Sequence, residues 1–276
     1  MRNAIVLTII LLILAPVCVK AVEPIGYWKF NEKNGTTAKD SSGNGFDATV
    51  DLGGGPEIWS PGEGFDSNGC AKFTAQQTVT IPDAIWSRVK DRLSIAFWVN
   101  QDPCAPPDDK WPGPWGIAPT EGLSHPDPNW LKLRAFVPTP NKAIDIGNDA
   151  ENIYWQATSD SDFAGSWNFY VFVKDANEYS LKLYHNGSKV AERYGAMEPI
   201  PKISNFIIGG RVSPKADWSG KIDDFRIYNK ALSPDDILKM YLAKSQPKPK
   251  AETKAEPKAE TKPKAEPKAG PKTEKK

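Results

Sequence analysis

The stretch Trp218 to Ile237 reads W-S-G-K-I-D-D-F-R-I-Y-N-K-A-L-S-P-D-D-I and carries the signals of a strand, a turn and a helix start. The two-residue period of a strand predicts Asp223, Phe225 and Ile227 on one face. An inward carboxylate beside apolar side chains needs a partner, because burying a charge is costly unless it is paired or bound to a metal. The strand therefore predicts a core face and a polar contact at Asp223.

A short helix is predicted directly after this strand. Ser233 suits the N-cap, Pro234 suits the first helical position, and Asp236 stands at the capping-box position. Apolar residues at helical spacing then give one stripe that requires burial. This stripe consists of Ile237, Met240 and Tyr241.

Two further segments resemble parts of a known fold. Gly26 to Gly45, G-Y-W-K-F-N-E-K-N-G-T-T-A-K-D-S-S-G-N-G, resembles an opening strand and the loop after it. Trp167 to Val190, W-N-F-Y-V-F-V-K-D-A-N-E-Y-S-L-K-L-Y-H-N-G-S-K-V, resembles a central hairpin. Together with the first stretch they resemble, in order and over residues 25–242, the laminin G-like (concanavalin A-like) jelly roll. The resemblance implies a fold more than a function, since one fold hosts many functions.

The rest of the chain predicts the same class from its own pattern. Short apolar stretches such as Leu93 to Asn100 recur with turn signals between them, and Asn186-Gly187 is typical of a hairpin turn. We expect an all-β fold, a two-sheet antiparallel jelly-roll sandwich, with a short C-terminal helix. One domain over residues 22–245 suits the size of such sandwiches.

Residues 1–21 have the pattern of a secretory signal peptide. Arg2 precedes the apolar run Ala4 to Val19, and Val19-Lys20-Ala21 fits a small-residue cleavage site. One alternative is an uncleaved membrane anchor, for which the run is short and is broken by Pro16. Another is a lipoprotein modified at Cys18, although that cysteine lacks a small residue before it. We expect cleavage and a secreted, periplasmic or cell-envelope protein.

The tail, residues 246–276, repeats K-A-E-P and K-A-E-T units and lacks the apolar residues of a core, so we predict that it is disordered. The net charge of +1 divides unevenly: the tail carries +5 and residues 1–21 carry +2, which leaves −6 for residues 22–245. An acidic domain argues against nucleic acid as a partner. The lysine-rich tail either contacts anionic envelope polymers or acts as a solubilising spacer.

After removal of residues 1–21, the cysteines that remain are Cys70 and Cys104. In an exported chain such a pair can form one disulfide. By loop-closure arithmetic the bridge would stabilise the fold by roughly 3–4 kcal/mol. The alternative is two separate buried thiols.

Residues 103–129 contain eight prolines and show no strand or helix period. Long structureless loops in compact domains are often functional. Tryptophan rings stack on the apolar face of a sugar, while carboxylates and amides bind its hydroxyl rim. We therefore predict a ligand-binding site here, or else packing of the loop onto the sandwich. The candidates are Trp111, Trp115, Trp130, Asp108, Asp109, Asp127 and Asn129, with Tyr154 and Trp155 as further aromatic residues.

The resemblance also implies a metal site. Asp223 resembles the family position whose carboxylate meets the loop after the first strand, and Asp40 and Asn44 lie in that loop. Calcium takes about six to eight oxygen ligands, so carboxylates together with loop carbonyls would suit a structural Ca²⁺. The alternative is that Asp223 only hydrogen-bonds backbone N–H groups of that loop.

No catalytic motif stands out in the sequence. The E-x-D-x-x-E pattern of jelly-roll glycanases, the G-x-S-x-G elbow and the H-E-x-x-H zinc motif are missing. His125 lies in the Pro-rich segment, and His185 lies beside a turn, where we expect it at the surface. We expect a non-catalytic binding module for carbohydrate or glycoconjugate. The alternatives are a module for adhesion to an extracellular protein, or for structure, and a divergent glycan-active enzyme.

Overall fold

The computed structural model describes residues 21–74, 77–102, 132–136, 143–147, 152–156, 159–162, 164–196, 200, 203, 206–209 and 219–245. The chain divides into two units, Met1–Ser245 and Gln246–Lys276, and the second lies outside the described residues. Residues 1–20 also lie outside them, so the signal peptide and the disordered tail stay predictions. No described helix is long and apolar enough to cross a membrane.

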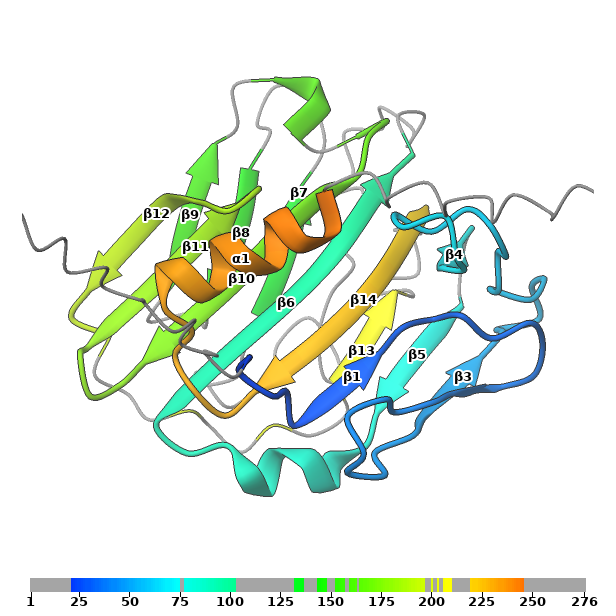
Figure 1. The fold of residues 1–276 in the computed structure, drawn as a ribbon, viewed down its shortest axis with the longest axis horizontal. Helices are drawn as coiled ribbons and strands as arrows, with labels where there is room; N and C mark the ends of the chain where they lie inside the picture. Colours follow the sequence, from blue (N-terminus) through cyan, green and yellow to red (C-terminus); the bar gives the residue numbers. More distant parts are fainter. Residues whose placement is uncertain are drawn as a thin grey trace, which may run out of the picture. The chain divides into compact units, whose positions relative to one another are not determined.

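Seven strands form the largest sheet, here called sheet A, in the order β1-β14-β6-β10-β11-β12, with β4 also paired to β14. All of its pairings are antiparallel. The first and last strands of the domain lie side by side, because β1 pairs along its whole length with β14 (Figure 1). The bounds are β1 Gly26–Trp28, β4 Ala71–Phe73, β6 Arg92–Gln101, β10 Asn168–Asp175, β11 Ser180–His185, β12 Ser188–Tyr194 and β14 Gly220–Tyr228.

Two smaller antiparallel sheets complete the strands. Sheet B has the order β13-β5-β3-β2, and sheet C the order β7-β8-β9. The bounds in sheet B are β2 Thr37–Ala38, β3 Ala48–Asp51, β5 Thr78–Ile81 and β13 Phe206–Gly209. Those in sheet C are β7 Lys132–Phe136, β8 Ala143–Gly147 and β9 Asn152–Gln156. The short 3₁₀ helices are η1 Asp83–Arg88 and η2 Asp160–Asp162.

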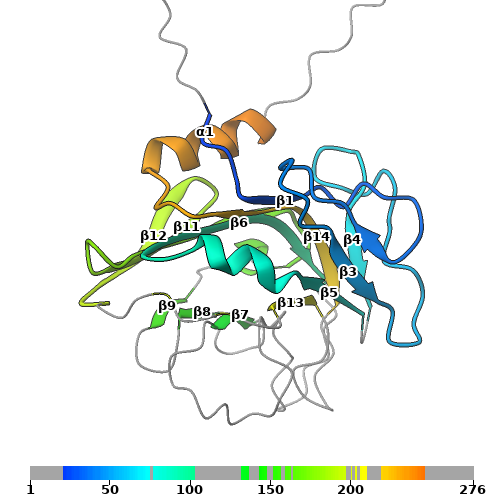
Figure 2. The same cartoon turned by 90° about the horizontal axis from the view of Figure 1, so that it is seen from below.

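The helix α1, Pro234–Ser245, lies on one side of sheet A, while β7, β8, β9 and β13 lie on the other (Figure 2). Two layers of antiparallel sheet with one C-terminal helix confirm the predicted sandwich. The predicted cap is also confirmed: the Ser233 Oγ accepts a hydrogen bond from Asp236 N–H at 3.1 Å and donates one to Asp236 Oδ2 at 2.6 Å. Ile237 is buried, and Met240 and Tyr241 pack against the same core.

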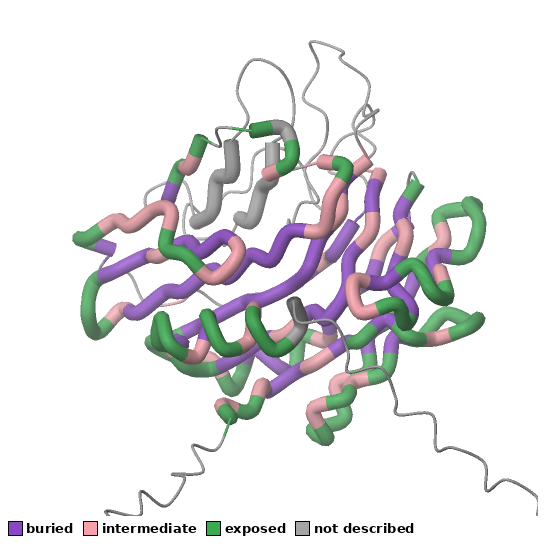
Figure 3. The backbone as a smooth tube through the Cα atoms, turned by 45° about the horizontal axis from the view of Figure 1, so that its top comes forward, coloured by how far each residue is buried: buried purple, intermediate pink, exposed green. Residues whose placement is uncertain are grey.

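Apolar side chains pack on both faces of sheet A, and the strands of this sheet are largely buried (Figure 3). The larger core fills the space toward sheets B and C and includes Trp28, Phe97, Phe172, Phe206 and Phe225. The smaller core lies under α1 and includes Trp98, Phe169, Val171, Tyr184 and Ile237. Sheet A is therefore covered on both faces, which explains its near-continuous apolar strands.

A β-bulge interrupts the regular alternation of β14. Asp223 pairs with Trp98, and Arg226 pairs with Ala96, so β14 has one residue more than β6 between these pairs. Asp224, inside the bulge, has a φ of 52°, a left-handed conformation that aspartate tolerates better than most residues.

The bulge changes which face Asp223 occupies. Directly opposite residues of a sheet share a face, so Asp223 lies with Trp98 on the α1 side. Phe225 and Ile227 belong to the larger core on the other side. The prediction of one common face was therefore wrong, because the extra residue shifts the alternation.

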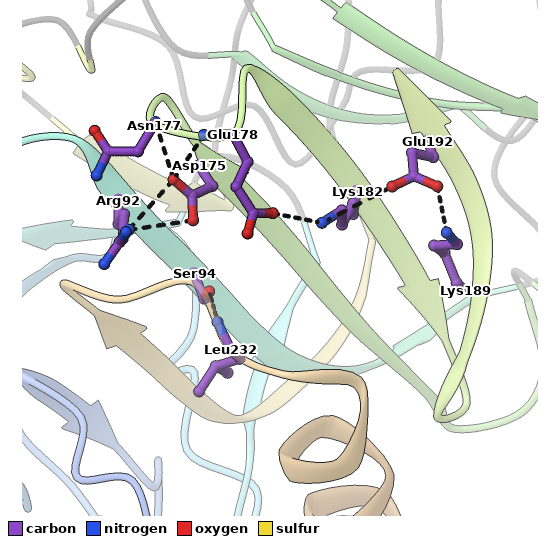
Figure 4. A network of polar contacts seen from close by, with 9 residues as sticks. All are labelled: Arg92, Ser94, Asp175, Asn177, Glu178, Lys182, Lys189, Glu192 and Leu232. Atoms are coloured by element: carbon purple, nitrogen blue, oxygen red, sulfur yellow. Dashed lines mark hydrogen bonds and ion pairs between the residues drawn. The ribbon is translucent and has the colours of Figure 1, made fainter. Parts of the chain in front are cut away.

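Charged residues occupy the part of sheet A beside the start of α1 (Figure 4). The Arg92 Nε lies 3.2 Å from Asp175 Oδ2, and Asp175 Oδ1 accepts hydrogen bonds from backbone N–H groups of the following turn. Farther along β11 and β12, Lys182 bridges Glu178 and Glu192 at 3.3 and 3.8 Å. These charged side chains are therefore paired with one another on sheet A.

Candidate functional site

The predicted ligand-binding residues of the Pro-rich segment lie outside the described residues. They are Trp111, Trp115, Trp130, Asp108, Asp109, Asp127 and Asn129. The flank where this segment begins is described and is fixed by hydrogen bonds. Gln101 C=O accepts one from Gly165 N–H at 2.9 Å, and Asp102 N–H donates one to Ser219 C=O at 3.2 Å. Gln101 therefore lies beside the turn that precedes β10.

An aromatic cluster occupies the start of β10 and the end of β11, close to that flank. Tyr170 pairs with His185 across the two strands, and their rings are stacked with centroids 4.9 Å apart. From β9, the Trp155 ring lies 5.0 Å from the His185 ring and 6.4 Å from the Tyr170 ring. His185 is only 9% exposed, so the prediction of a surface position was wrong.

Hydrogen bonds fix the orientation of the His185 ring. Asn168 Nδ2 donates to two backbone carbonyls, those of Ser161 at 2.8 Å and Ser166 at 3.2 Å. Its Oδ1 therefore faces His185 Nε2 at 2.7 Å and also accepts a hydrogen bond from Asn186 Nδ2 at 3.2 Å. Since a carbonyl oxygen only accepts, Nε2 must carry a proton.

Burial lowers the pKa of His185, although the charge of Asp162 acts in the opposite direction. The ring is therefore neutral near pH 7, with Nδ1 as an acceptor. Nε2 bonds the amide oxygen of Asn168, which gives this histidine a positioning role. The contacts of the Trp155 ring with the His185 and Tyr170 rings hold β9 against sheet A.

Tyr154 projects from the outer face of sheet C. It is 55% exposed, whereas its neighbour Ile153 is buried and its neighbour Trp155 packs against the larger core. Successive residues of a strand point to opposite faces, so the two predicted aromatic candidates separate into an exposed ring and an inner support. The register of sheet C places Asp145 of β8 and Arg134 of β7 in one row with Tyr154. This row is called the Tyr154 row below.

The loop after β1 is organised by Asp40. Its Oδ1 accepts hydrogen bonds from Tyr27 N–H at 3.0 Å and Ser42 N–H at 2.8 Å. Its Oδ2 accepts them from Ser42 O–H at 2.8 Å and Phe46 N–H at 2.9 Å. Burial acts to raise the pKa of Asp40, but these hydrogen bonds outweigh it and lower the pKa. A carboxylate has about four lone-pair sites, and the chain itself fills them here.

The other predicted calcium ligands have partners of their own. Asn44 donates to Ile25 C=O at 3.2 Å and accepts from Arg88 at 2.6 Å. Asp223, buried beside the loop of residues 60–70, accepts a hydrogen bond from Phe65 N–H at 3.0 Å. Among the described residues, no three His, Cys, Asp or Glu side chains group as metal ligands. Calcium binding at the loop of Asp40 and Asn44 stays a prediction.

Cys70 is a buried free thiol, and its Sγ lies 3.9 Å from the carbonyl oxygen of Ser60. Burial, followed by the nearby charge of Asp223, raises the pKa of Cys70 to about 12. A thiol with so high a pKa is a poor nucleophile at neutral pH. Cys104 lies outside the described residues, so the disulfide stays a prediction.

The sequence did contain a signal for the His185 cluster. The hairpin formed by β10 and β11 turns at residues 176–179, and counting back from that turn pairs Tyr170 with His185. The same count puts both residues on the face of Phe172 and Leu183, which belong to the larger core. The surface position of His185 was predicted from the adjacent Asn186-Gly187 turn alone, and that turn does not reveal the pairing of β10 with β11.

The layered antiparallel sheets, with first and last strands paired and an aromatic cluster at one end, define a lectin-like jelly roll. The chain belongs to the concanavalin A-like lectin/glucanases superfamily, whose laminin G model matches residues 73–238. This confirms the family expected from the three sequence segments.

Solved structures with the same fold include domains in complex with a glycan or a protein. One is domain 4 of AbnA, a GH43 extracellular arabinanase from Geobacillus stearothermophilus, in complex with arabinotriose. The two sequences are 19% identical, the TM-score is 0.56, and the match covers 80% of this chain and 100% of the arabinanase domain. The binding domain of botulinum neurotoxin DC matches as a complex with SialylT (15% identity, TM-score 0.55, 80% and 52% of the two chains). It also matches as a complex with rat synaptotagmin II (14% identity, TM-score 0.56, 80% and 52%).

At these identities the likeness shows the fold alone. The chain spans about half the length of the neurotoxin chains that it matches. A comparison with curated proteins gave no match.

Proposed function

We propose that this protein is an exported, non-catalytic binding module that recognises a carbohydrate or glycoconjugate. The observation that carries the proposal is the exposed Tyr154 ring, held on a strand that the His185 cluster fixes from beneath. A sugar has an apolar C–H face and a polar rim, so a rigid exposed ring beside hydrogen-bonding residues suits it.

The Tyr154 row supplies the residue types that this recognition requires. An aromatic, an acid and a base occupy one row, and the acid and the base are residue types that bind sugar hydroxyls. Sheet C begins where the Pro-rich segment ends, at Lys132, so the predicted Trp111 and Trp115 belong to the same region of the chain. In this proposal Trp111 and Trp115 also contribute to glycan binding.

The structural neighbours support a binding role. The arabinanase domain was solved in complex with arabinotriose, and one neurotoxin domain in complex with SialylT. The chemistry at His185 supports the same view, because its Nε2 is committed to an amide oxygen. Export follows from the signal-peptide pattern of residues 1–21 and is part of the proposal.

A Tyr154→Ala variant tests the site. Loss of one stacking ring should weaken glycan binding by about tenfold, which corresponds to roughly 1.4 kcal/mol and is of the order of one aromatic contact. Arabino-oligosaccharides and sialylated glycans are the first probes, followed by a wide polysaccharide panel. Binding would be measured by titration calorimetry or biolayer interferometry, after circular dichroism has shown that the variant is folded.

Leu242→Ala is the matched control. Leu242 is a large side chain with 43% exposure, but it lies on α1, on the opposite side of sheet A from sheet C (Figure 2). The control should bind like the parent protein. A Tyr154→Ala variant that binds a glycan as tightly as the parent does would place the site elsewhere.

Adhesion to a protein is the second candidate function. One neurotoxin domain was solved in complex with rat synaptotagmin II, and α1 exposes two leucines one helical turn apart, Leu238 and Leu242. An adhesion surface calls for a larger contiguous apolar patch than this pair provides. A partner protein whose binding depends on Leu238 and Leu242, with Tyr154 dispensable, would favour this function instead.

A further inference from the structure

The chain contains four Asn-Gly pairs, and the hydrogen bonds of their asparagine side chains differ. They begin at Asn34, Asn44, Asn68 and Asn186. An Asn-Gly pair can rearrange spontaneously, because glycine has no side chain to hinder approach of its nitrogen to the asparagine carboxamide. None of the residues proposed above for glycan binding belongs to these pairs.

The rearrangement is a balanced substitution that needs only water. The glycine nitrogen loses its proton and attacks the Cγ carbon of asparagine, and the side-chain nitrogen leaves as ammonia. The resulting succinimide ring is then hydrolysed at one of its two carbonyls. One opening gives aspartate, and the other gives isoaspartate, in which the main chain runs through the side-chain carbon.

Two of the four asparagines are held at both ends of the carboxamide. Asn186 Oδ1 accepts a hydrogen bond from Phe169 N–H at 2.8 Å, and its Nδ2 donates to Asn168 Oδ1 at 3.2 Å. Asn44 is bonded in the same way to Arg88 at 2.6 Å and to Ile25 at 3.2 Å. These bonds must break before either Cγ can turn toward the next nitrogen.

The pair that begins at Asn68 is held on both reacting groups. Asn68 Nδ2 donates to Asp66 Oδ2 at 2.9 Å. The Gly69 nitrogen, which would have to attack, donates its proton to Asn31 Oδ1 at 2.7 Å. Gly69 is also buried against the backbone of Phe30, which leaves little space for a ring to form.

Asn34 differs from the other three. It is exposed, and within the described part of the chain its carboxamide has no hydrogen-bond partner. The next nitrogen, that of Gly35, is likewise without a partner there. Gly35 has a φ of 90° with open space around the position of a Cβ atom. Both reacting groups are thus accessible in the folded protein.

We propose that Asn34 is a site of spontaneous deamidation in the folded protein, while the other three Asn-Gly pairs are protected by the fold. The modification has a structural consequence nearby. Gly35 C=O accepts a hydrogen bond from the Trp59 indole N–H at 2.7 Å, and Thr36 C=O accepts one from Val50 N–H at 3.0 Å. An isoaspartate at position 34 lengthens the main chain next to both bonds and adds a negative charge close to Glu32.

Peptide mapping by mass spectrometry tests this proposal. The full-length protein would be held folded at mildly alkaline pH, and deamidation of each Asn-Gly peptide would be followed over time. Asn34 should deamidate roughly tenfold or more faster than Asn186, whose two hydrogen bonds must first be broken. Enzymatic methylation of isoaspartate would identify the product, and an Asn34→Gln variant should lose most of the methylation.

The same measurement in concentrated urea is the control. Without the fold, all four pairs should react at similar rates, since each has glycine as its next residue. Equal rates for Asn34 and Asn186 in the folded protein would overturn the proposal. So would an Asn34 that stays intact in the folded protein while it reacts in urea.

Discussion

The backbone N–H of Phe65 donates a hydrogen bond of 3.0 Å to the carboxylate of Asp223, across 158 residues of sequence. The bond sets the Phe65 ring flat on the Trp98 indole, with centroids 3.4 Å apart and planes 11° from parallel. Gly64 permits this approach, because a Cβ there would lie 2.8 Å from Asp223 Oδ2. One buried carboxylate therefore closes a long loop over the core beneath α1.

Replacement of this carboxylate should loosen the loop. In Asp223→Ala the Phe65 N–H loses its acceptor in a buried position, which should lower the free energy of unfolding by about 1–3 kcal/mol. Urea denaturation measures this change. Glu57→Ala, at an exposed acid, is the control and should change stability by no more than about 0.5 kcal/mol. Equal stability of the two variants would contradict the role given to Asp223.

A buried charge cluster joins β1 to β14 and gives a second prediction. The Arg226 Nη2 lies 3.0 Å from the Tyr27 hydroxyl and 3.4 Å from Asp224 Oδ1, and Tyr27 O–H also donates to Asp224. Arg226→Ala leaves Asp224 without its buried countercharge and should cost about 3–5 kcal/mol of stability. Tyr27→Phe removes only a hydroxyl and should cost about 1 kcal/mol. Urea denaturation measures both costs, and a Tyr27→Phe variant less stable than Arg226→Ala would contradict this prediction.

The buried histidine predicts a pH dependence of stability. Burial lowers the pKa of His185 below its ordinary 6.5, so in acid the unfolded chain takes up this proton before the folded protein does. The stability from the neutral ring is full above about pH 6.5 and is lost as the pH falls below that value toward the folded pKa. His185→Gln should flatten this part of the stability profile. An unchanged profile, or an NMR titration that puts the His185 pKa above 6.5, would contradict the account.

Removal of divalent cations tests the metal prediction. The Asp40 carboxylate accepts four hydrogen bonds from the chain, two on each oxygen. If calcium also binds at this loop, as predicted, the melting temperature should fall in excess chelator, recover on addition of calcium, and not respond to chelator in Asp40→Asn. Equal melting temperatures in chelator and in calcium would contradict the calcium prediction.

Local patterns in the sequence predicted local features well. The helix cap depends only on Ser233 and the residues just after it, and the structure has the predicted hydrogen bonds. The aromatic residues Trp28 and Trp98, which lie in two of the expected strands, are buried. These features follow from periodicity and capping, which act within a few residues.

Features that depend on distant pairing could not be predicted in the same way. The bulge at Asp224 appears only when β14 is set against β6, and it reverses the face of Asp223. The partner of that carboxylate, Phe65, comes from a loop whose sequence carries no signal for the contact. His185 was misplaced for a related reason, because its burial follows from the register of β10 and β11.

Carbohydrate recognition can be tested by binding of the protein lacking residues 1–21 to a broad glycan and polysaccharide panel. We expect binding to at least one glycan class, weakened in Tyr154→Ala and also in Trp111→Ala or Trp115→Ala, with Leu242→Ala unaffected. Circular dichroism of each variant would establish that the fold is retained. A folded protein that binds no glycan in the panel would contradict the account and favour a protein partner.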